Sequence, residues 1–138
     1  MTVSILCVGQ LRDIGLREAA AEYEKRLSRY CRLKTVETDN RGLCALPGRA
    51  YKIALCVEGR QMSSEEFAAD IDHVITAGKS ELVFVIGGAD GLPDAVKGAC
   101  DLRLSFSRMT FPHRLMRVIL LEQIYRALSI LKGENYHH

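Results

Sequence analysis

The sequence of 138 residues contains no tryptophan and only 3 prolines, and it lacks two familiar nucleotide-binding motifs. Neither the Gly-x-Gly-x-x-Gly dinucleotide fingerprint nor the Gly-Lys-Ser/Thr of a P-loop occurs. Its 5 cysteines form no Cys-x-x-Cys pair and no histidine stands at zinc-finger spacing, which argues against a metal site. The first apolar run, residues 3–8, is too short for a signal or membrane segment. We therefore expect a cytoplasmic protein that binds neither a metal nor a membrane.

What the sequence does contain is typical of one globular domain. Apolar residues make up 48% of the chain and charged residues 26%, which excludes disordered and collagen-like classes. A length of 138 residues suits a single domain over residues 1–138. Cys7 and Cys56 lie in apolar runs, where free cysteine behaves as a small buried hydrophobe, as expected in a reducing compartment.

Charge is distributed unevenly along the chain. Residues 12–34 carry 7 Lys and Arg against 4 Asp and Glu, and residues 103–132 carry 6 against 1. Residues 58–101 between them carry only 3 against 9. If the two basic regions meet in space they offer a cationic surface to a polyanion, although solvated helix faces explain the charges equally well.

Apolar periodicity predicts alternating strands and helices. Strands are expected at residues 3–8, 33–38, 52–57, 81–86 and 102–106, and helices at residues 15–30, from about Ser64, at 93–99 and at 114–131. Gly59 is expected to end the third strand, and residues 39–49 are expected to form a loop. The order predicts an α/β fold with a mostly parallel sheet, in which ligands bind beyond the carboxyl ends of strands. Functional loops should therefore follow Val57, Ile86 and Phe106.

Two of these loops offer candidate binding groups. Gly87 and Gly88 at a strand end would allow a backbone to approach a ligand or adopt a positive φ, but such a pair is also common in a plain tight turn. Residues 106–113 form an apolar loop with small polar side chains, which fits either a pocket that reads an adenine edge or a packed crossover.

The last predicted helix carries two further signals. Its apolar residues cover more than one stripe, so we expect a partner chain to bury a second side. Arg114 and Arg117 stand near its start, where the helix dipole disfavours cations, and an anionic partner would explain them. Glu122 and Arg126 have the i,i+4 spacing of an ordinary ion pair.

The chain ends in Tyr136-His137-His138, which is either a frayed end or a group that closes over a site.

Several blocks taken together resemble the ribosomal large subunit methyltransferase H family of the SPOUT class. They are residues 83–92 (VFVIGGADGL), 104–113 (LSFSRMTFPH), Arg117-Val118 with 122–127 (EQIYRA), and Tyr136-His137. Residues 8–11 (VGQL) and 22–27 (EYEKRL) extend the resemblance over most of the chain. The resemblance would also place a helix between the second and third strands, where this chain has only residues 39–49.

The resemblance implies a C-terminal deep trefoil knot, a homodimer, and transfer of a methyl group from S-adenosyl-L-methionine to N3 of a pseudouridine in 23S rRNA within the ribosome. The implied cofactor-binding residues are Leu55, Gly87, Phe106, Ser107, Arg108, Met109, Thr110 and Phe111. His137, Tyr136 and Arg108 are the implied catalytic residues, and Arg114, Arg117 and Lys132 the implied RNA-binding residues. The competing hypothesis is a nonenzymatic α/β RNA-binding or ribosome-assembly module, which would lack the cofactor pocket.

Overall fold

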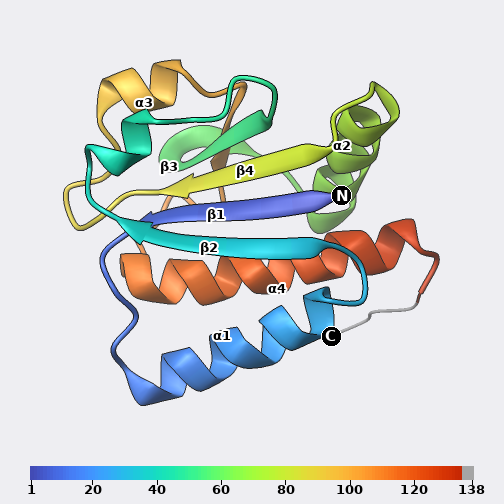
Figure 1. The fold of residues 1–138 in the computed structure, drawn as a ribbon, viewed down its shortest axis with the longest axis horizontal. Coiled ribbons are helices and arrows are strands. Elements are labelled where there is room, and N and C mark those ends of the chain that lie inside the picture. Colours follow the sequence, from blue (N-terminus) through green and yellow to red (C-terminus); the bar gives the residue numbers. More distant parts are fainter. Residues whose placement is uncertain (135–138) are drawn as a thin grey trace.

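A computed structural model of the chain describes residues 1–134 and contains a five-stranded sheet (Figure 1). The strands are β1 (Thr2–Val8), β2 (Arg32–Thr38), β3 (Tyr51–Gln61), β4 (Glu81–Ile86) and β5 (Leu102–Ser105). Their order across the sheet is β2-β1-β4-β3-β5, and every neighbouring pair is parallel. The prediction of a parallel α/β sheet is confirmed, and β2 and β5 form its two edges.

The two faces of the sheet are covered unequally. Helices α1 (Ile14–Leu27), α2 (Ser64–Thr76) and α4 (His113–Leu131) enclose the larger core, which contains Ile5, Phe84 and Leu121. The short helix α3 (Asp94–Gly98) and the 3₁₀ turn η1 (Gly42–Cys44) lie over the smaller one, around Val83 and Val85. Figure 1 shows the three long helices on one side of the sheet and the two short ones on the other. Alternate residues of β4 therefore serve opposite cores, as a strand period of two requires.

Local sequence explains where the helices begin. Ser63 and Glu66 form a capping box, because the Ser63 hydroxyl accepts from the Glu66 N–H at 3.1 Å and the Glu66 carboxylate accepts from the Ser63 N–H at 3.1 Å. Asp13 caps α1 by accepting from the Leu16 N–H at 2.9 Å. Phe67 and Ile71 of α2 are buried in the larger core.

The expectation that Gly59 ends the third strand is wrong. β3 continues to Gln61, and Leu55 and Arg60 both pair with Leu104 of β5, so the residues between them form a large bulge. A Cβ on Gly59 would lie 2.7 Å from the backbone carbon of Arg103. Glycine is needed here because the bulge returns to the sheet in close contact with the neighbouring backbone.

Other predicted boundaries differ by a few residues. α1 ends at Leu27, so the turn at residues 28–30 follows the helix, and β5 ends before Phe106. Pro93 caps α3 instead of filling its first position. The predicted loop at residues 39–49 contains η1, which buries Leu43 completely in the smaller core. This buried leucine explains why the connection folds onto the sheet.

Helix α4 packs against both α1 and α2 and against the sheet. Leu120, Leu121 and Ile124 are completely buried by these contacts. Leu115 and Leu131 nevertheless remain exposed, and Met116, Val118 and Ile119 are only half-buried. The expectation that a partner chain covers this apolar surface stays a prediction.

Candidate functional site

A cavity of about 660 Å³ opens at the carboxyl ends of β3, β4 and β5. Three segments line it, residues 55–58, 86–92 and 104–113 without Arg108, together with Lys97 and Met116. These segments include the loops that are expected to be functional from the sequence, because the carboxyl ends of parallel strands meet at one edge of a sheet. The volume lies within the range of roughly 300–1,000 Å³ found for small-molecule sites.

The first wall of the cavity is the turn at residues 87–92. The Gly91 N–H donates to the Gly88 carbonyl at 3.0 Å, which closes a tight turn. Neither Gly87 nor Gly88 has a positive φ, whereas Gly91 has φ of +79°. A Cβ on Gly87 would lie 2.5 Å from the backbone carbon of Gly91. The close approach at Gly87 is thus made by the turn's own backbone, and the expected option of a positive φ is wrong. The approach of a ligand to this glycine pair stays a prediction.

The second wall is the crossover at residues 106–112, between β5 and α4. Its few polar contacts are local, with the Ser105 hydroxyl donating to the Ser107 carbonyl at 2.9 Å and the Met109 N–H to the Ser107 hydroxyl at 3.0 Å. Met109 is 73% exposed, and Phe111 is half-buried. This wall therefore presents side chains to the cavity, where the first presents mainly backbone.

Charged groups lie along the side of the cavity formed by the β3 bulge and α3. Glu58 in the bulge forms an ion pair with Lys97 of α3, and this hydrogen bond lowers the pKa of Glu58 and raises that of Lys97. Asp90 also lines the cavity. The lining thus contains two carboxylates and one ammonium, and this net negative charge favours a ligand with net positive charge.

The structure brings together all the predicted cofactor-binding residues except Arg108. Leu55, Gly87, Phe106, Ser107, Met109, Thr110 and Phe111 line the cavity. Arg108 is exposed and does not contribute to the lining. Tyr136 and His137 lie outside the described residues. Binding and catalysis by these residues stay predictions.

Sequence reasoning gave no role to Glu58 and Lys97, which both line the cavity. Glu58 could not be selected because no local sequence pattern predicts the bulge. His113 lies within the predicted loop at residues 106–113, and in the structure it begins α4 and lines the cavity.

The predicted RNA-binding residues differ in exposure. Arg114 and Lys132 are exposed. Arg117 is only 8% exposed, and its guanidinium pairs with Glu37 of β2 at 2.8 Å. An external anion is therefore not needed to explain Arg117 near the helix start. The prediction of a phosphate contact by this residue is not supported by its burial.

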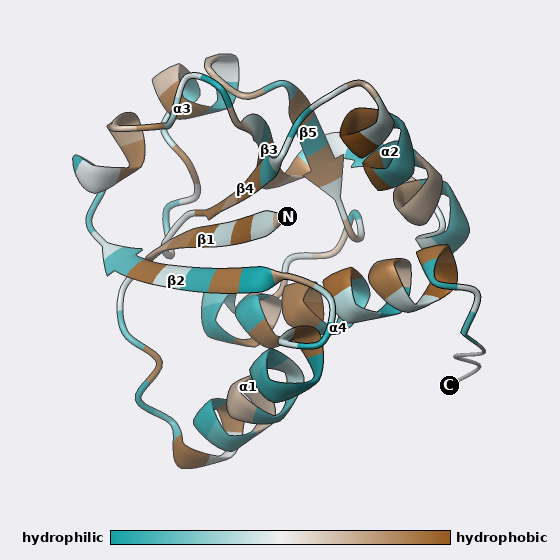
Figure 2. Cartoon of the chain, turned by 45° about the vertical axis from the view of Figure 1, so that its right-hand side comes forward, coloured by the Kyte–Doolittle hydropathy of each residue, from teal (hydrophilic) through white to brown (hydrophobic). Residues whose placement is uncertain are grey.

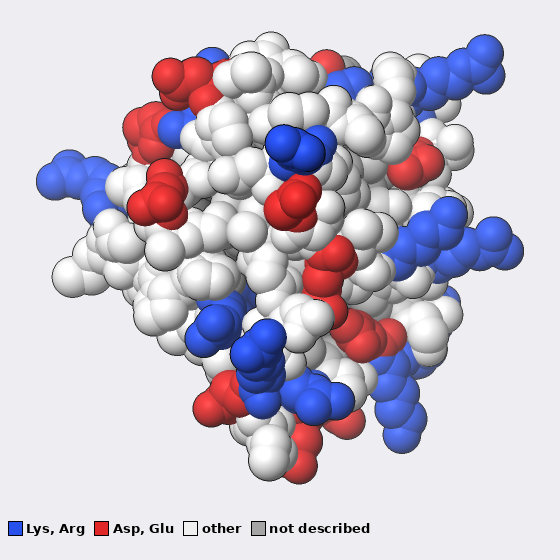
Figure 3. All heavy atoms as spheres, turned by 60° about the vertical axis from the view of Figure 1, so that its left-hand side comes forward, with Lys and Arg blue, Asp and Glu red and all other residues white. Residues whose placement is uncertain are grey.

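The two basic regions do meet in space, because α1 packs against α4. Figure 3 shows the side of the molecule that carries the carboxyl ends of the strands, where Lys and Arg lie at the bottom and at both sides with Asp and Glu among them. The cationic surface expected from the sequence stays a prediction.

Two kinds of feature are missing from residues 1–134. No helix there has the length and apolar character needed to cross a membrane. The same residues contain no group of three or more His, Cys, Asp or Glu placed to hold a metal ion.

Comparison with known proteins shows which family the chain is similar to. A family model described as predicted SPOUT methyltransferase matches residues 1–137. The ribosomal RNA large subunit methyltransferase H of Listeria monocytogenes is 44% identical over 158 aligned positions, which cover 99% of each chain. That of Clostridioides difficile is 42% identical with the same coverage. The solved structure of a methylase family protein from Haemophilus influenzae matches with a TM-score of 0.57 and 12% identity, over 99% of this chain and 71% of that chain, which indicates a shared fold.

The alignment with these relatives is longer than the chain. It spans 158 positions, whereas the chain has 138 residues, so at least 20 positions contain no residue from this chain. The family resemblance places a helix between the second and third strands, whereas the connection from β2 to β3 in this chain contains only the turn η1. The cavity lies at other loops, and this short connection contributes nothing to its lining.

Proposed function

Because the chain belongs to the SPOUT methyltransferase family, we propose that it transfers a methyl group from S-adenosylmethionine to N3 of a pseudouridine in 23S rRNA within the ribosome. The observation that carries the proposal is the cavity at the ends of β3, β4 and β5. Its lining contains every predicted cofactor-binding residue except Arg108, in a chain 44% identical to a relative named as an rRNA methyltransferase.

The cavity suits this cofactor in chemistry as well as size. Glu58 and Asp90 give the lining a net negative charge, which complements a cofactor that carries a sulfonium and an amino-acid group. Phe106, Met109 and Phe111 supply apolar and aromatic surface for a purine. When bound, S-adenosylmethionine supplies a methyl group already activated by its sulfonium, so the chain has mainly to align donor and acceptor and accept a proton.

The remaining roles are assigned by the family resemblance. His137 or Tyr136, from the partner's tail, would help to remove the N3 proton, with Arg108 in the crossover. Arg114 and Lys132, both exposed, would contact rRNA phosphates. A homodimer is supported by Leu115 and Leu131, which are exposed on α4, and the family's deep trefoil knot is proposed for the C-terminal half.

Two measurements test the proposed function. Calorimetric titration with S-adenosylmethionine should give saturable one-to-one binding per chain. Incubation with ribosomes that lack this methylation should yield N3-methylpseudouridine in the 23S rRNA, detected by mass spectrometry of nucleosides. Absence of cofactor binding would contradict the proposal, and cofactor-independent binding to ribosomes without turnover would favour the nonenzymatic module.

The composite site is tested by mixing subunits. Deletion of residues 136–138 removes no described core residue, so stability and cofactor affinity should change little while methylation falls strongly. A heterodimer of one tail-deleted subunit and one Gly87→Val subunit should recover at most one competent site. Full activity of the tail-deleted homodimer, or a monomer in sedimentation at micromolar concentration, would remove the shared site.

A further inference from the structure

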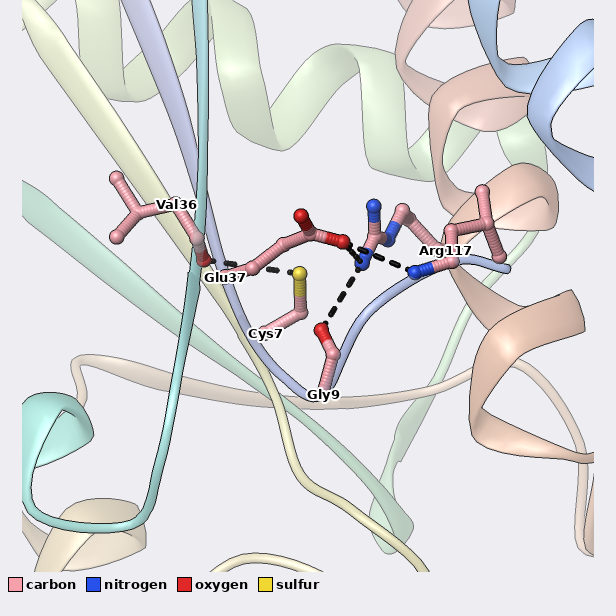
Figure 4. A network of polar contacts seen from close by, with 6 residues as sticks. Cys7, Gly9, Val36, Glu37 and Arg117 are labelled. Carbon is pink, nitrogen blue, oxygen red and sulfur yellow. Dashed lines mark hydrogen bonds and ion pairs between the residues drawn. The ribbon is translucent and has the colours of Figure 1, made fainter.

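Arg117 joins three segments of the chain that are far apart in sequence. Its Nη2 donates to Glu37 Oε2 at 2.8 Å and to the Gly9 carbonyl at 3.4 Å (Figure 4). The same Glu37 oxygen accepts from the Leu11 N–H at 3.0 Å. One guanidinium and one carboxylate thus fasten helix α4 and the end of β2 to the turn that follows β1.

This turn also contacts the start of α4 beside the cavity. Gly9 has φ of +87°, and a Cβ placed on it would lie 3.9 Å from His113 Nε2. His113 and Met116 line the cavity, and Arg117 follows His113 by one helical turn. The turn at residues 9–11 therefore lies between the Arg117 ion pair and the first turn of α4.

Arg117 is placed where a cation is costly. The guanidinium is almost completely buried, and it stands near the helix N-terminus, where the dipole disfavours positive charge. The hydrogen bond from Arg117, followed by that from the Leu11 N–H, lowers the pKa of Glu37, so both partners are charged at neutral pH. Buried ion pairs add little net stability compared with apolar packing, and their best-supported use is to specify one arrangement.

We propose that Arg117 is a positioning residue for the cavity, which holds the turn at residues 9–11 in place through Glu37 and thereby sets His113 and the first turn of α4 against the bound cofactor. This inference rests on the proposed function. It gives Arg117 an internal role in place of the rRNA phosphate contact that the sequence predicts.

The test compares two ion pairs on the same helix. Arg117→Met breaks the pair with Glu37. Arg126→Met breaks the predicted pair with Glu122, which the structure confirms at 2.6 Å with side chains 19% and 18% exposed. That second pair lies within α4 and contributes no residue to the cavity lining. It is therefore a matched control for the loss of a partly buried ion pair.

We expect Arg117→Met to weaken S-adenosylmethionine binding about tenfold, the scale of effect when a binding wall is slightly misplaced. Arg126→Met should change the affinity less than about twofold, although it should lower the melting temperature about as much as Arg117→Met does. Arg117→Lys keeps the charge near Glu37 and should restore part of the affinity. If Arg117→Met fails to fold, the double variant Arg117→Met/Glu37→Leu removes both charges of the pair and takes its place.

Two readouts separate positioning from a phosphate contact. A positioning role leaves the salt dependence of ribosome binding unchanged, whereas loss of a phosphate contact lowers its logarithmic slope by about one. Unchanged cofactor affinity together with a lower slope would overturn the proposal.

A readout independent of the cofactor keeps the inference distinct from the proposed function. The Leu11 amide, bonded to Glu37, should lose protection from hydrogen exchange in Arg117→Met and keep it in Arg126→Met. The His113 ring signals should shift only in the first variant. If the wild-type protein binds no S-adenosylmethionine, the proposed function fails. Separately, if Arg117→Met leaves the Leu11 protection and the His113 signals unchanged, the positioning role is overturned.

Discussion

The two walls of the cavity are built in opposite ways. In the turn at residues 87–92, Gly87 is buried against the backbone of Gly91, and Leu92 is anchored in the smaller core. In the crossover at residues 106–112, Met109 and Thr110 are exposed, and the polar contacts are local. The first wall acquires its shape as part of folding, whereas the second is left free to adapt its side chains to a ligand. Substitutions should therefore couple stability and binding in the first wall and separate them in the second.

The largest effect is expected from Gly87→Val. The added side chain would collide with the Gly91 backbone, and overpacking of this kind costs about 1–3 kcal/mol of unfolding free energy. Cofactor affinity should fall by more than about 100-fold, since the whole turn must move. Urea unfolding and calorimetric titration measure the two effects. Gly48→Val is the control, because nothing lies within 4 Å of a Cβ there. Loss of binding without loss of stability would show that Gly87 contacts the ligand and not its own turn.

Gly59→Ala extends the same comparison to the β3 bulge. Its Cβ would meet the backbone of Arg103 and Leu104 at 2.7 to 2.8 Å, so the bulge that carries Glu58 must shift. We expect about 1 kcal/mol lower stability and an affinity about tenfold weaker. Gly98→Ala, where the Cβ enters open space, should leave both quantities unchanged. Equal behaviour of the two variants would mean that the bulge tolerates a side chain and that its glycine has no structural role.

Phe111→Ala tests the adaptable wall. Removal of a half-buried ring that lines the cavity should weaken cofactor binding about fivefold, or about 1 kcal/mol, with little change in the melting temperature. Val36→Ala, on an exposed part of β2 away from the cavity, controls for the loss of surface hydrophobicity. A stability loss as large as that of Gly87→Val would remove the distinction between the walls.

The smallest effect is expected from Lys97→Gln, which breaks the ion pair with Glu58 beside the first wall. Such exposed pairs contribute less than about 1 kcal/mol. The pKa of Glu58 lies below its ordinary value of 4.5 because Lys97 donates to it, so the contribution is present above pH 4.5 and is lost as the pH falls further. Urea unfolding of both proteins between pH 7 and pH 3 should therefore show a stability difference that fades in acid. Lys79→Gln removes only a bond to the Arg49 carbonyl, and its effect should not depend on pH in this range.

Sequence reasoning located the strands, the helices and the edge of the sheet that carries the cavity. These features follow from local signals, such as the apolar run of β4 and the capping box at Ser63 and Glu66. The bulge after Leu55 could not be predicted, because it arises from pairing with β5 some 45 residues later, outside any local window. Gly59 therefore looked like an ordinary strand end.

The role of Arg117 was misjudged for a related reason. A cation near a helix start indicates an anion, but the sequence does not say whether that anion is inside or outside the chain. Here the carboxylate is Glu37, 80 residues earlier, which reaches Arg117 only because β2 lies next to β1 in the sheet. Helix periodicity alone also could not reveal that Arg117 is buried.

The strand order also determines how the sheet ends. At one edge β5 has only four residues, and at the other β2 exposes Arg32 and Lys34 in a strand where hydrophilic and hydrophobic residues alternate (Figure 2). Short and charged edge strands are the means by which proteins prevent a foreign strand from adding to a sheet. Neither edge offers the long uncharged template on which fibrils grow. Growth of an assembly by strand addition at either edge of the sheet is thus disfavoured.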